Sequence, residues 1–267
     1  RAKRTYSYYF PLFSYDERRK TLVEHLLSIL FFFVSLIYSS IGLGGGSSYI
    51  ALMTIFGISY QTIPATSLIL NLVVTFIGMI SFWYNGHGRL DLVVPLLIIS
   101  TPMAYLGGLL TLPENIFQII LLTTLIIVAV RIYIFQHLRT KFHISGNKRF
   151  IFIIVIGSVL GFIAGAVGIG GGIYLVPLII MFGLGSDKEA AATGATFIWF
   201  NSLAGVISRL QSGTIDADFI LPLVGAVMVG GFTGSYLGAV RYNAKTSQNI
   251  VGLVVVIAIM VLSKDIL

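Results

Sequence analysis

The sequence predicts an all-α, polytopic helical membrane protein built of two homologous repeats. Of its 267 residues, 57% are hydrophobic and only 10% are charged, whereas about a quarter of the residues of a soluble domain are charged. Apolar segments nearly long enough to cross a bilayer recur along the chain, and one glycine-rich motif occurs twice. These observations predict the fold class before any single residue is considered.

Eight apolar segments are long, and most approach the roughly 20 residues that a helix needs to cross the bilayer. They are residues 22–38, 65–83, 92–110, 116–135, 150–167, 190–207, 219–239 and 249–262. Two shorter segments, 49–56 and 174–182, each follow a glycine cluster. A helix of about eleven residues is roughly 16 Å long, about half of the hydrocarbon thickness. We therefore expect eight to ten segments, two of them short, broken or re-entrant helices.

Positive charge gathers in two places, although the whole chain carries a net charge of +7. Residues 1–20 hold six Lys and Arg and residues 137–149 hold four. Such residues near membrane spans favour the cytoplasmic side. We expect a basic, cytoplasmic or interfacial N-terminal segment 1–20, a first transmembrane repeat 21–136, a basic linker 137–149 and a second transmembrane repeat 150–267. If the short segments instead count as crossings, the halves are inverted and one basic segment lies outside.

The internal repeat is carried by "IGLGGG" at 41–46 and "VGIGGG" at 167–172, which are separated by 126 residues, from Gly42 to Gly168. Further along, "PATSLILN" answers "TGATFIWFN", which pairs Thr66 with Thr196 and Asn71 with Asn201. Secondary transporters are often built of such repeats, with broken helices at matching places marking the binding site.

The two glycine clusters are predicted to bind an anion inside the bundle. Glycine adopts the positive φ angles of a sharp break and lets a ligand approach the backbone. The short helix that follows directs unpaired N–H groups and the positive end of its dipole at that ligand. The backbone donors expected are Gly44, Gly45, Gly46 and Ser47 in the first half, and Gly170, Gly171 and Gly172 in the second. The alternative is that these glycines serve close helix packing alone, as we expect for the glycines at every fourth position in 157–165 and 230–238.

Polar side chains on the next helix of each half supply further candidate ligands: Thr66, Ser67 and Asn71, then Thr193, Thr196 and Asn201, with Phe197 where the first half has Ser67. A buried amide needs partners in hydrocarbon, so the two asparagines are the strongest of these.

His87, Arg89 and Arg209 lie at predicted turns and are candidates for a vestibule that attracts anions, with solvated loop charges as the alternative.

Several function classes are excluded or disfavoured. The absence of cysteine excludes disulfides and cysteine nucleophiles. No Ser/His/Asp or His-Glu-x-x-His arrangement is present, so we expect no catalysis, no metal and no cofactor. The aromatic and basic residues of the first 20 positions are better explained by a membrane surface than by nucleic acid.

The duplicated glycine motif, with the "FG" after each short helix, the threonine-containing helix and the G-x-x-D turn, resembles the TauE/SafE sulfite exporter family, within the 4-toluene sulfonate uptake permease superfamily. The similarity covers about residues 25–264. The resemblance implies a multi-pass cell-membrane transporter that exports small sulfur-containing anions such as sulfite, sulfoacetate or other organosulfonates. One alternative is an importer of sulfate or another small organic anion, and another is a membrane scaffold that transports nothing. We expect a small anionic substrate and membrane lipid as partners, and a homo-oligomer is compatible with the sequence.

Overall fold

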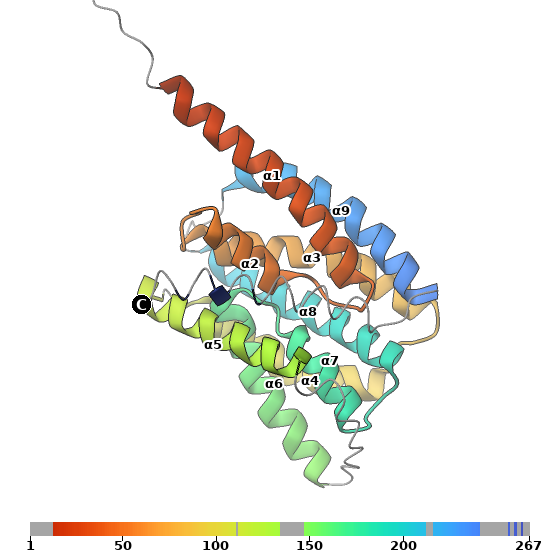
Figure 1. Ribbon diagram of the computed structural model, residues 1–267. Helices are drawn as coiled ribbons and strands as arrows, with labels where there is room; N and C mark the ends of the chain where they lie inside the picture. Colours follow the sequence, from red (N-terminus) through yellow and green to blue (C-terminus); the bar gives the residue numbers. More distant parts are fainter. Residues whose placement is uncertain are drawn as a thin grey trace, which may run out of the picture.

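The computed structural model describes residues 13–110, 112–133, 147–211 and 216–240, with residues 256, 259, 260 and 263 near the C-terminus. Within these residues the structure has nine helices and no strand (Figure 1). The helices are α1 (Phe13–Ser39), α2 (Gly46–Ile55), α3 (Thr62–Tyr84), α4 (Leu90–Gly108), α5 (Glu114–Tyr133), α6 (Asn147–Val167), α7 (Gly172–Met181), α8 (Asp187–Leu210) and α9 (Ala217–Val240).

Five of these helices, α1, α3, α4, α8 and α9, are long and apolar enough to cross a membrane. The predicted class, a polytopic helical membrane protein, is therefore confirmed. The predicted number of eight long spans is not reached in the described residues, because α5 and α6 offer shorter apolar stretches, Glu114–Ile127 and Ile151–Val167. The eighth segment, 249–262, lies almost wholly outside the described residues.

The two short helices, α2 and α7, are each 10 residues long and each begins directly after a left-handed glycine, Gly45 or Gly171. Both also end in the same way. Gly57 has a φ of 72° and Gly183 a φ of 61°, and the amide two positions after each short helix's Phe bonds back to the helix, Ile58 to Met53 O and Leu184 to Ile179 O. This is the glycine-terminated helix end that only a left-handed residue permits, which explains the repeated "FG".

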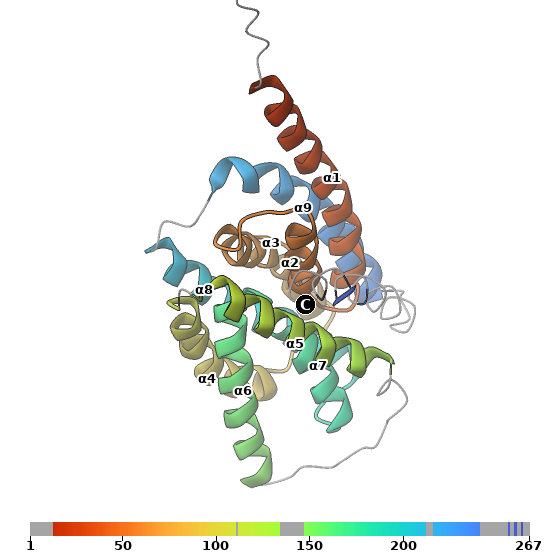
Figure 2. The ribbon, with the colours of Figure 1, turned by 60° about the vertical axis from the view of Figure 1, so that its left-hand side comes forward.

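The helices pair in a regular way. The most extensive contacts join α4 with α6, α1 with α9 and α3 with α8, while α3 also packs on α9 and α4 on α8. Both views show α3 and α8 inside the bundle, with α1 and α9 on one side and α4 and α6 on the other (Figures 1 and 2). The pairs that cover the two sides are held at small-residue seams. The close approach is shown by the positions where an added Cβ would meet backbone: Gly161 against Ser100, Gly165 against Ala104, Gly234 against Leu36 and Gly238 against Ser40. The packing role predicted for these glycines is confirmed.

The direction of each helix follows from these contacts. Gly161 and Gly165 meet successive turns of α4 in ascending order, so α6 runs parallel to α4, and Gly234 and Gly238 make α9 parallel to α1 in the same way. Val74 and Gly78 meet Gly231 and Ser235 in ascending order, so α9 is also parallel to α3. A turn at residues 85–89 reverses the chain between α3 and α4. Consequently α1 and α6 run in opposite directions, as Figure 2 shows.

This arrangement corrects one expectation. The N-terminal ends of α1 and α6, which carry the basic residues 18–20 and 148–149, lie at opposite ends of the bundle, so these two groups of basic residues do not share one side. The remaining Lys and Arg of the two basic segments lie outside the described residues. Because α1 and α3 are parallel, residues 40–61 must return across the bundle. This return is made by the ten-residue helix α2 with the non-helical residues on either side of it, 40–45 and 56–61. The short helix therefore completes a crossing and does not turn back as a re-entrant loop.

Candidate functional site

Each glycine cluster leaves the first amides of a short helix without a partner. At the start of α2 the N–H groups of Ser48 and Tyr49 both donate to Gly45 O, at 3.0 and 2.9 Å. Among the described residues, no acceptor contacts the N–H groups of Gly44, Gly45, Gly46 or Ser47. At the start of α7, Gly171 O accepts from Tyr174 and Leu175, and Gly172 donates to Gly170 O. All these residues are buried except Tyr174, which is partly buried, so the two helix starts are interior, as predicted, and hold unused donors.

The two breaks lie against each other in the centre of the bundle. A Cβ placed on Gly46, in the first half, would meet Ile169 O in the second. The Ser67 hydroxyl of α3 lies 2.8 Å from Gly168 O and 3.3 Å from Gly46 O. Its single proton is thus shared between one carbonyl of each break. The predicted ligand Ser67 therefore has a structural contact in this conformation, and it joins the two halves.

Asn71, one turn further along α3, has the most unusual surroundings in the site. Its side chain is fully buried, and neither Nδ2 nor Oδ1 has a hydrogen-bond partner among the described residues. A Cβ on Gly44, on Gly46 or on Gly170 would each meet this amide. An unpaired buried amide is costly. The structure thus brings an unused side-chain donor and acceptor against both glycine breaks.

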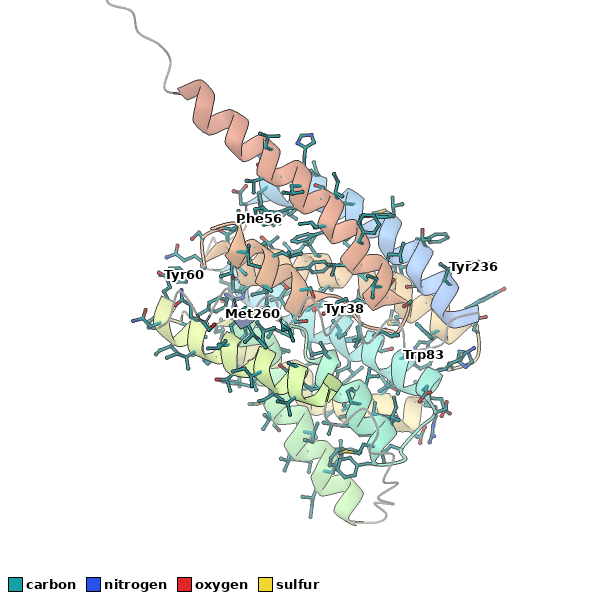
Figure 3. The ribbon with its side chains drawn as sticks, viewed as in Figure 1. Tyr38, Phe56, Tyr60, Trp83, Tyr236 and Met260 are labelled. Carbon is teal, nitrogen blue, oxygen red and sulfur yellow. The ribbon has the colours of Figure 1, made fainter. Side chains whose placement is uncertain are left out.

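A hydroxyl cluster beside the first break was not predicted. The Tyr38 hydroxyl, on the last turn of α1, lies 2.6 Å from Ser48 Oγ and 3.2 Å from Ser47 Oγ (Figure 3). Tyr38 is buried. The signal that could have revealed it is the position of a tyrosine three residues before the glycine motif, since α1 must end there. Ser47 thus has a side-chain partner, while its amide stays open.

The predicted threonines fall into two groups. Thr66 and Thr193 are fully buried, and their hydroxyls have no partner among the described residues. Thr196 is instead bonded twice, accepting from Trp83 Nε1 at 2.9 Å and donating to Ala192 O at 2.8 Å. It ties α8 to the end of α3, as the position of Trp83 in Figure 3 shows.

The sequence-based prediction that Asn71 and Asn201 occupy equivalent places in the two halves is wrong, because they do not make equivalent contacts with the breaks. Gly46 packs on Asn71, whereas the matching Gly172 packs on Ile198. Gly171 packs on Phe197, and Gly170 lies between Ile198 and Asn71. Asn201 lies one turn beyond Ile198 on α8 and is fully buried, and its amide also has no partner within the part of the chain that the structure describes. The second half therefore presents an isoleucine where the first presents an amide.

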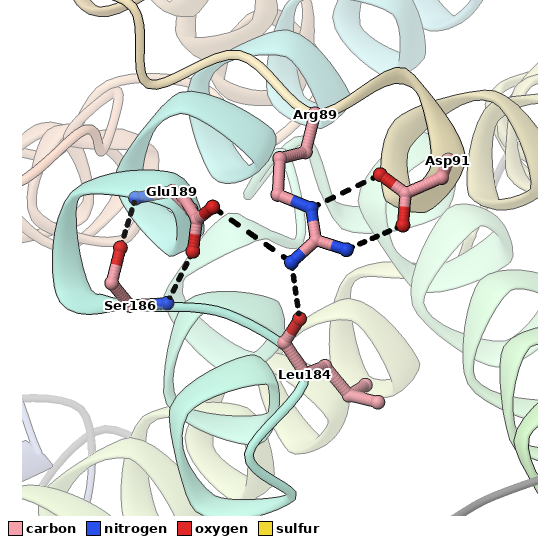
Figure 4. A network of polar contacts seen from close by, with 5 residues as sticks. All are labelled: Arg89, Asp91, Leu184, Ser186 and Glu189. Atoms are coloured by element: carbon pink, nitrogen blue, oxygen red, sulfur yellow. Dashed lines mark hydrogen bonds and ion pairs between the residues drawn. The ribbon is translucent and has the colours of Figure 1, made fainter.

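The three candidate vestibule residues do not gather in one place. Arg89, after α3, makes a bidentate ion pair with Asp91 and donates to Leu184 O at 3.2 Å (Figure 4). It also lies 3.8 Å from Glu189, which closes the capping box of Ser186 at the start of α8. The hydrogen bond to Asp91 raises the pKa of Arg89, and burial lowers that of the neighbouring His87. This cluster joins the α3–α4 turn to the α7–α8 turn.

Arg209 lies in the last turn of α8, at the other end of that helix from Glu189. It is only 6% exposed, so the solvated alternative is wrong for this residue. Its Nη2 donates to Gly165 O at 3.0 Å and to Ala166 O at 2.8 Å. A cation at the C-terminal carbonyls of α6 is favourable for the helix dipole, and this contact fixes the end of α6 just before the second break.

These features define a multi-pass helical membrane protein with a closed, buried site of neutral donors at its centre. The family model described as "Sulfite exporter TauE/SafE" matches residues 27–262. The chain belongs to this family, and it is a membrane transporter.

Individual relatives of the chain are also described as probable membrane transporters. The probable membrane transporter protein y4hK of Sinorhizobium fredii is 33% identical over 218 residues, which cover 81% of this chain and 88% of the relative. The probable membrane transporter protein ORF9 of a Sinorhizobium species is 28% identical over 244 residues, 89% of this chain and 91% of the relative. The probable membrane transporter protein YdhB of Bacillus subtilis is 24% identical over 222 residues, 80% of this chain and 88% of the relative. No solved structure matches the chain significantly.

Proposed function

We propose that the protein exports a small sulfur-containing anion, such as sulfite, sulfoacetate or another organosulfonate, by alternating exposure of the site where the two glycine breaks meet. The observation that carries the proposal is the combination of two adjacent helix starts with unpaired N–H groups and a buried, unpartnered amide, Asn71, that touches both. The description of the matching family as sulfite exporters supports the choice of anion.

The chemistry of the site suits an oxyanion. Sulfonate and sulfite oxygens accept N–H bonds from helix starts without requiring a cation in contact. The contacts recorded for the two breaks come from neutral groups: the Ser67 hydroxyl, the Asn71 amide and apolar side chains. The membrane potential, negative inside, favours anion exit by about 2.3 kcal/mol per charge per 100 mV. Export therefore needs no coupling carboxylate in the bundle.

The proposed mechanism also includes a finer architecture, two homologous repeats of opposite direction that bring the total to ten segments. It is supported by the way contacts occur in pairs: α1 with α9 and α6 with α4, then α3 with α9 and α8 with α4. Inverted repeats let one half rock against the other around a fixed site. The breaks and Asn71 are buried in the present conformation, so substrate enters only when the halves separate.

The test is flux through purified protein in liposomes. We expect saturable, potential-dependent efflux of sulfite or of a sulfonate such as methanesulfonate, driven towards the positive compartment. Sulfate uptake that is saturable, with no sulfonate flux, would support the importer alternative. A scaffold predicts no saturable flux of any anion.

A further inference from the structure

Residues of α3 and α8 that occupy equivalent places in the two halves can be identified by comparing the contacts that each half makes with the other. Gly42 packs on Ala191 of α8, and Gly168, which lies 126 residues after Gly42, packs on Pro64 of α3. Pro64 and Ala191 are therefore counterparts, separated by 127 residues. Gly78 packs on Ala195 and Gly205 packs on Leu68, so Gly78 corresponds to Gly205 and Leu68 to Ala195, and each pair of counterparts is again 127 residues apart. A register of 127 thus relates α3 to α8.

The sequence agrees with this register once it is applied. Identical or similar residues then coincide along both helices: Thr66 with Thr193, Thr75 with Ser202, Gly78 with Gly205, Ile80 with Ile207 and Ser81 with Ser208. Thr66 and Thr193 also share full burial and an unpartnered hydroxyl. In this register the counterpart of Asn71 is Ile198, as their contacts with Gly46 and Gly172 show.

Asn201 has a different place. Its counterpart is Val74, which packs on Gly231 of α9 and not on a break. Gly205, four residues further along the same stripe of α8, lies against Leu68 of α3 and Gly165 of α6. The atoms nearest to the glycines of the two breaks include the amide of Asn71 and none from Asn201.

We infer that Asn71 alone determines side-chain recognition of the anion, that Ile198 is an apolar wall opposite it, and that among the proposed anions the site selects a singly charged one, such as hydrogensulfite or a simple sulfonate, over the doubly charged sulfoacetate. This inference rests on the proposed function. Two observations point to a ligand at this place: the open N–H groups of two ten-residue helices, and a fully buried amide without a partner between them. An oxyanion that accepts from Asn71 Nδ2 satisfies one of its unused groups, and a protonated oxyanion also satisfies Oδ1.

The charge preference follows from desolvation. The free-energy cost of moving an ion out of water rises with the square of its charge. The atoms nearest to the glycines of the two breaks belong to backbone, neutral polar and apolar groups, and Arg209, before the second break, already donates to Gly165 O and Ala166 O. Methanesulfonate and sulfate are tetrahedral and similar in size but carry one and two charges. They are therefore a matched pair of probes.

The experiment measures anion-dependent thermal stabilisation of the purified full chain in detergent, together with flux in liposomes. We expect methanesulfonate to raise the unfolding temperature and sulfate at equal ionic strength to have no specific effect. Asn71→Ala should weaken methanesulfonate binding by roughly tenfold or more, as expected for loss of a hydrogen bond to a charged group. Asn201→Ala is the matched control, because it removes an equally buried and unpartnered amide, and its affinity should change by less than about twofold.

The possible outcomes distinguish a failure of the inference from a failure of the proposed function. If Asn201→Ala abolishes binding and Asn71→Ala does not, or if sulfate binds as tightly as methanesulfonate, the inference is overturned while the proposed function stands. If the unmodified protein neither binds nor transports any anion, the proposed function itself fails. Should Asn71→Ala unfold without ligand, Asn71→Leu preserves volume and tests the same point. Ile198→Asn gives an independent check, since an amide opposite Asn71 should change the affinity for methanesulfonate.

Discussion

The two halves of the molecule use one backbone design and different side chains. In each half a left-handed glycine starts a ten-residue helix, and an "FG" ends it. At the contact with the breaks, however, the first half places Ser67 and Asn71, and the second places Gly194 and Ile198. The missing side chain of Gly194 leaves space for Val176 and the carbonyl of Gly42. The comparison teaches that backbone geometry is shared by both halves, while polar recognition is concentrated in the first.

The same contrast recurs at the helix before each break. The last turn of α6 is held by Arg209 of α8, whose counterpart in α3 is Phe82, a buried aromatic residue. Phe82 packs on Ala191 and Ala192 of α8, so the second half has a hydrogen-bonding cation where the first half has a buried apolar side chain. Four sets of substitutions test how far the halves are equivalent.

The largest effect is expected where the halves are most alike, at the glycine seams. Gly165→Val and Gly234→Val each place atoms against backbone, at Ala104 O and Leu36 O. Neither carbonyl can move without displacing a helix, so each change should lower the free energy of unfolding by about 3 kcal/mol or more. Thermal or chemical unfolding in detergent measures this. Gly225→Ala, with no atom within 4 Å of its added Cβ, should be nearly neutral, and a similar loss at the α4–α6 seam and the α1–α9 seam would support their equivalence.

A second comparison truncates the counterparts Ile198 and Asn71. Ile198→Ala removes buried apolar atoms and should cost about 2–4 kcal/mol of folding stability. Asn71→Ala removes an amide without a partner, so it should cost less than about 1 kcal/mol. Equal losses in the two variants would mean that Asn71 packs as a structural residue, and its role as a ligand would then be doubtful.

The third change is Arg209→Met, which leaves the carbonyls of Gly165 and Ala166 without this donor. A loss of about 2 kcal/mol in folding stability is expected, because buried acceptors keep their desolvation cost. Arg209→Lys retains the charge with one compact donor group and should recover part of the loss. If Arg209→Met raised the free energy of unfolding, a buried apolar side chain such as Phe82 of the first half would serve equally well in the second half.

The smallest effect is expected at the Arg89 cluster in Figure 4. The side chains of Arg89 and Asp91 are 32% and 54% exposed, and ion pairs of this kind contribute about 0–1 kcal/mol. Arg89→Gln should therefore lower stability by less than about 1 kcal/mol, and the difference from the unmodified protein should shrink in high salt. Asp91→Asn provides the reciprocal measurement. A larger, salt-independent loss would show that the bond from Arg89 to Leu184 O carries the contact.

Sequence reasoning located the breaks, the short helices and Asn71, because each depends on neighbouring residues. Glycine runs, short apolar lengths and a buried amide are local signals. Asn71 was paired with Asn201 because the two asparagines coincide in a short sequence alignment. The α2–α3 and α7–α8 loops differ, however, and contacts between α3 and α8 relate these helices with an offset of 127 residues. The sequence also predicted Arg209 at a turn, as part of a vestibule or as a solvated loop charge, whereas α8 continues to Leu210 and buries this side chain.

The sequence by itself determined that the chain is helical, lies in a membrane and interrupts itself twice, since apolar length and the left-handed freedom of glycine act within a few residues. Only the tertiary structure decided that α1 and α6 run in opposite directions, that the breaks touch, and that Ile198 is the counterpart of Asn71. The physical reason is that these relations arise where seams of small residues on distant segments pack together, and such close packing has no local signature in the chain.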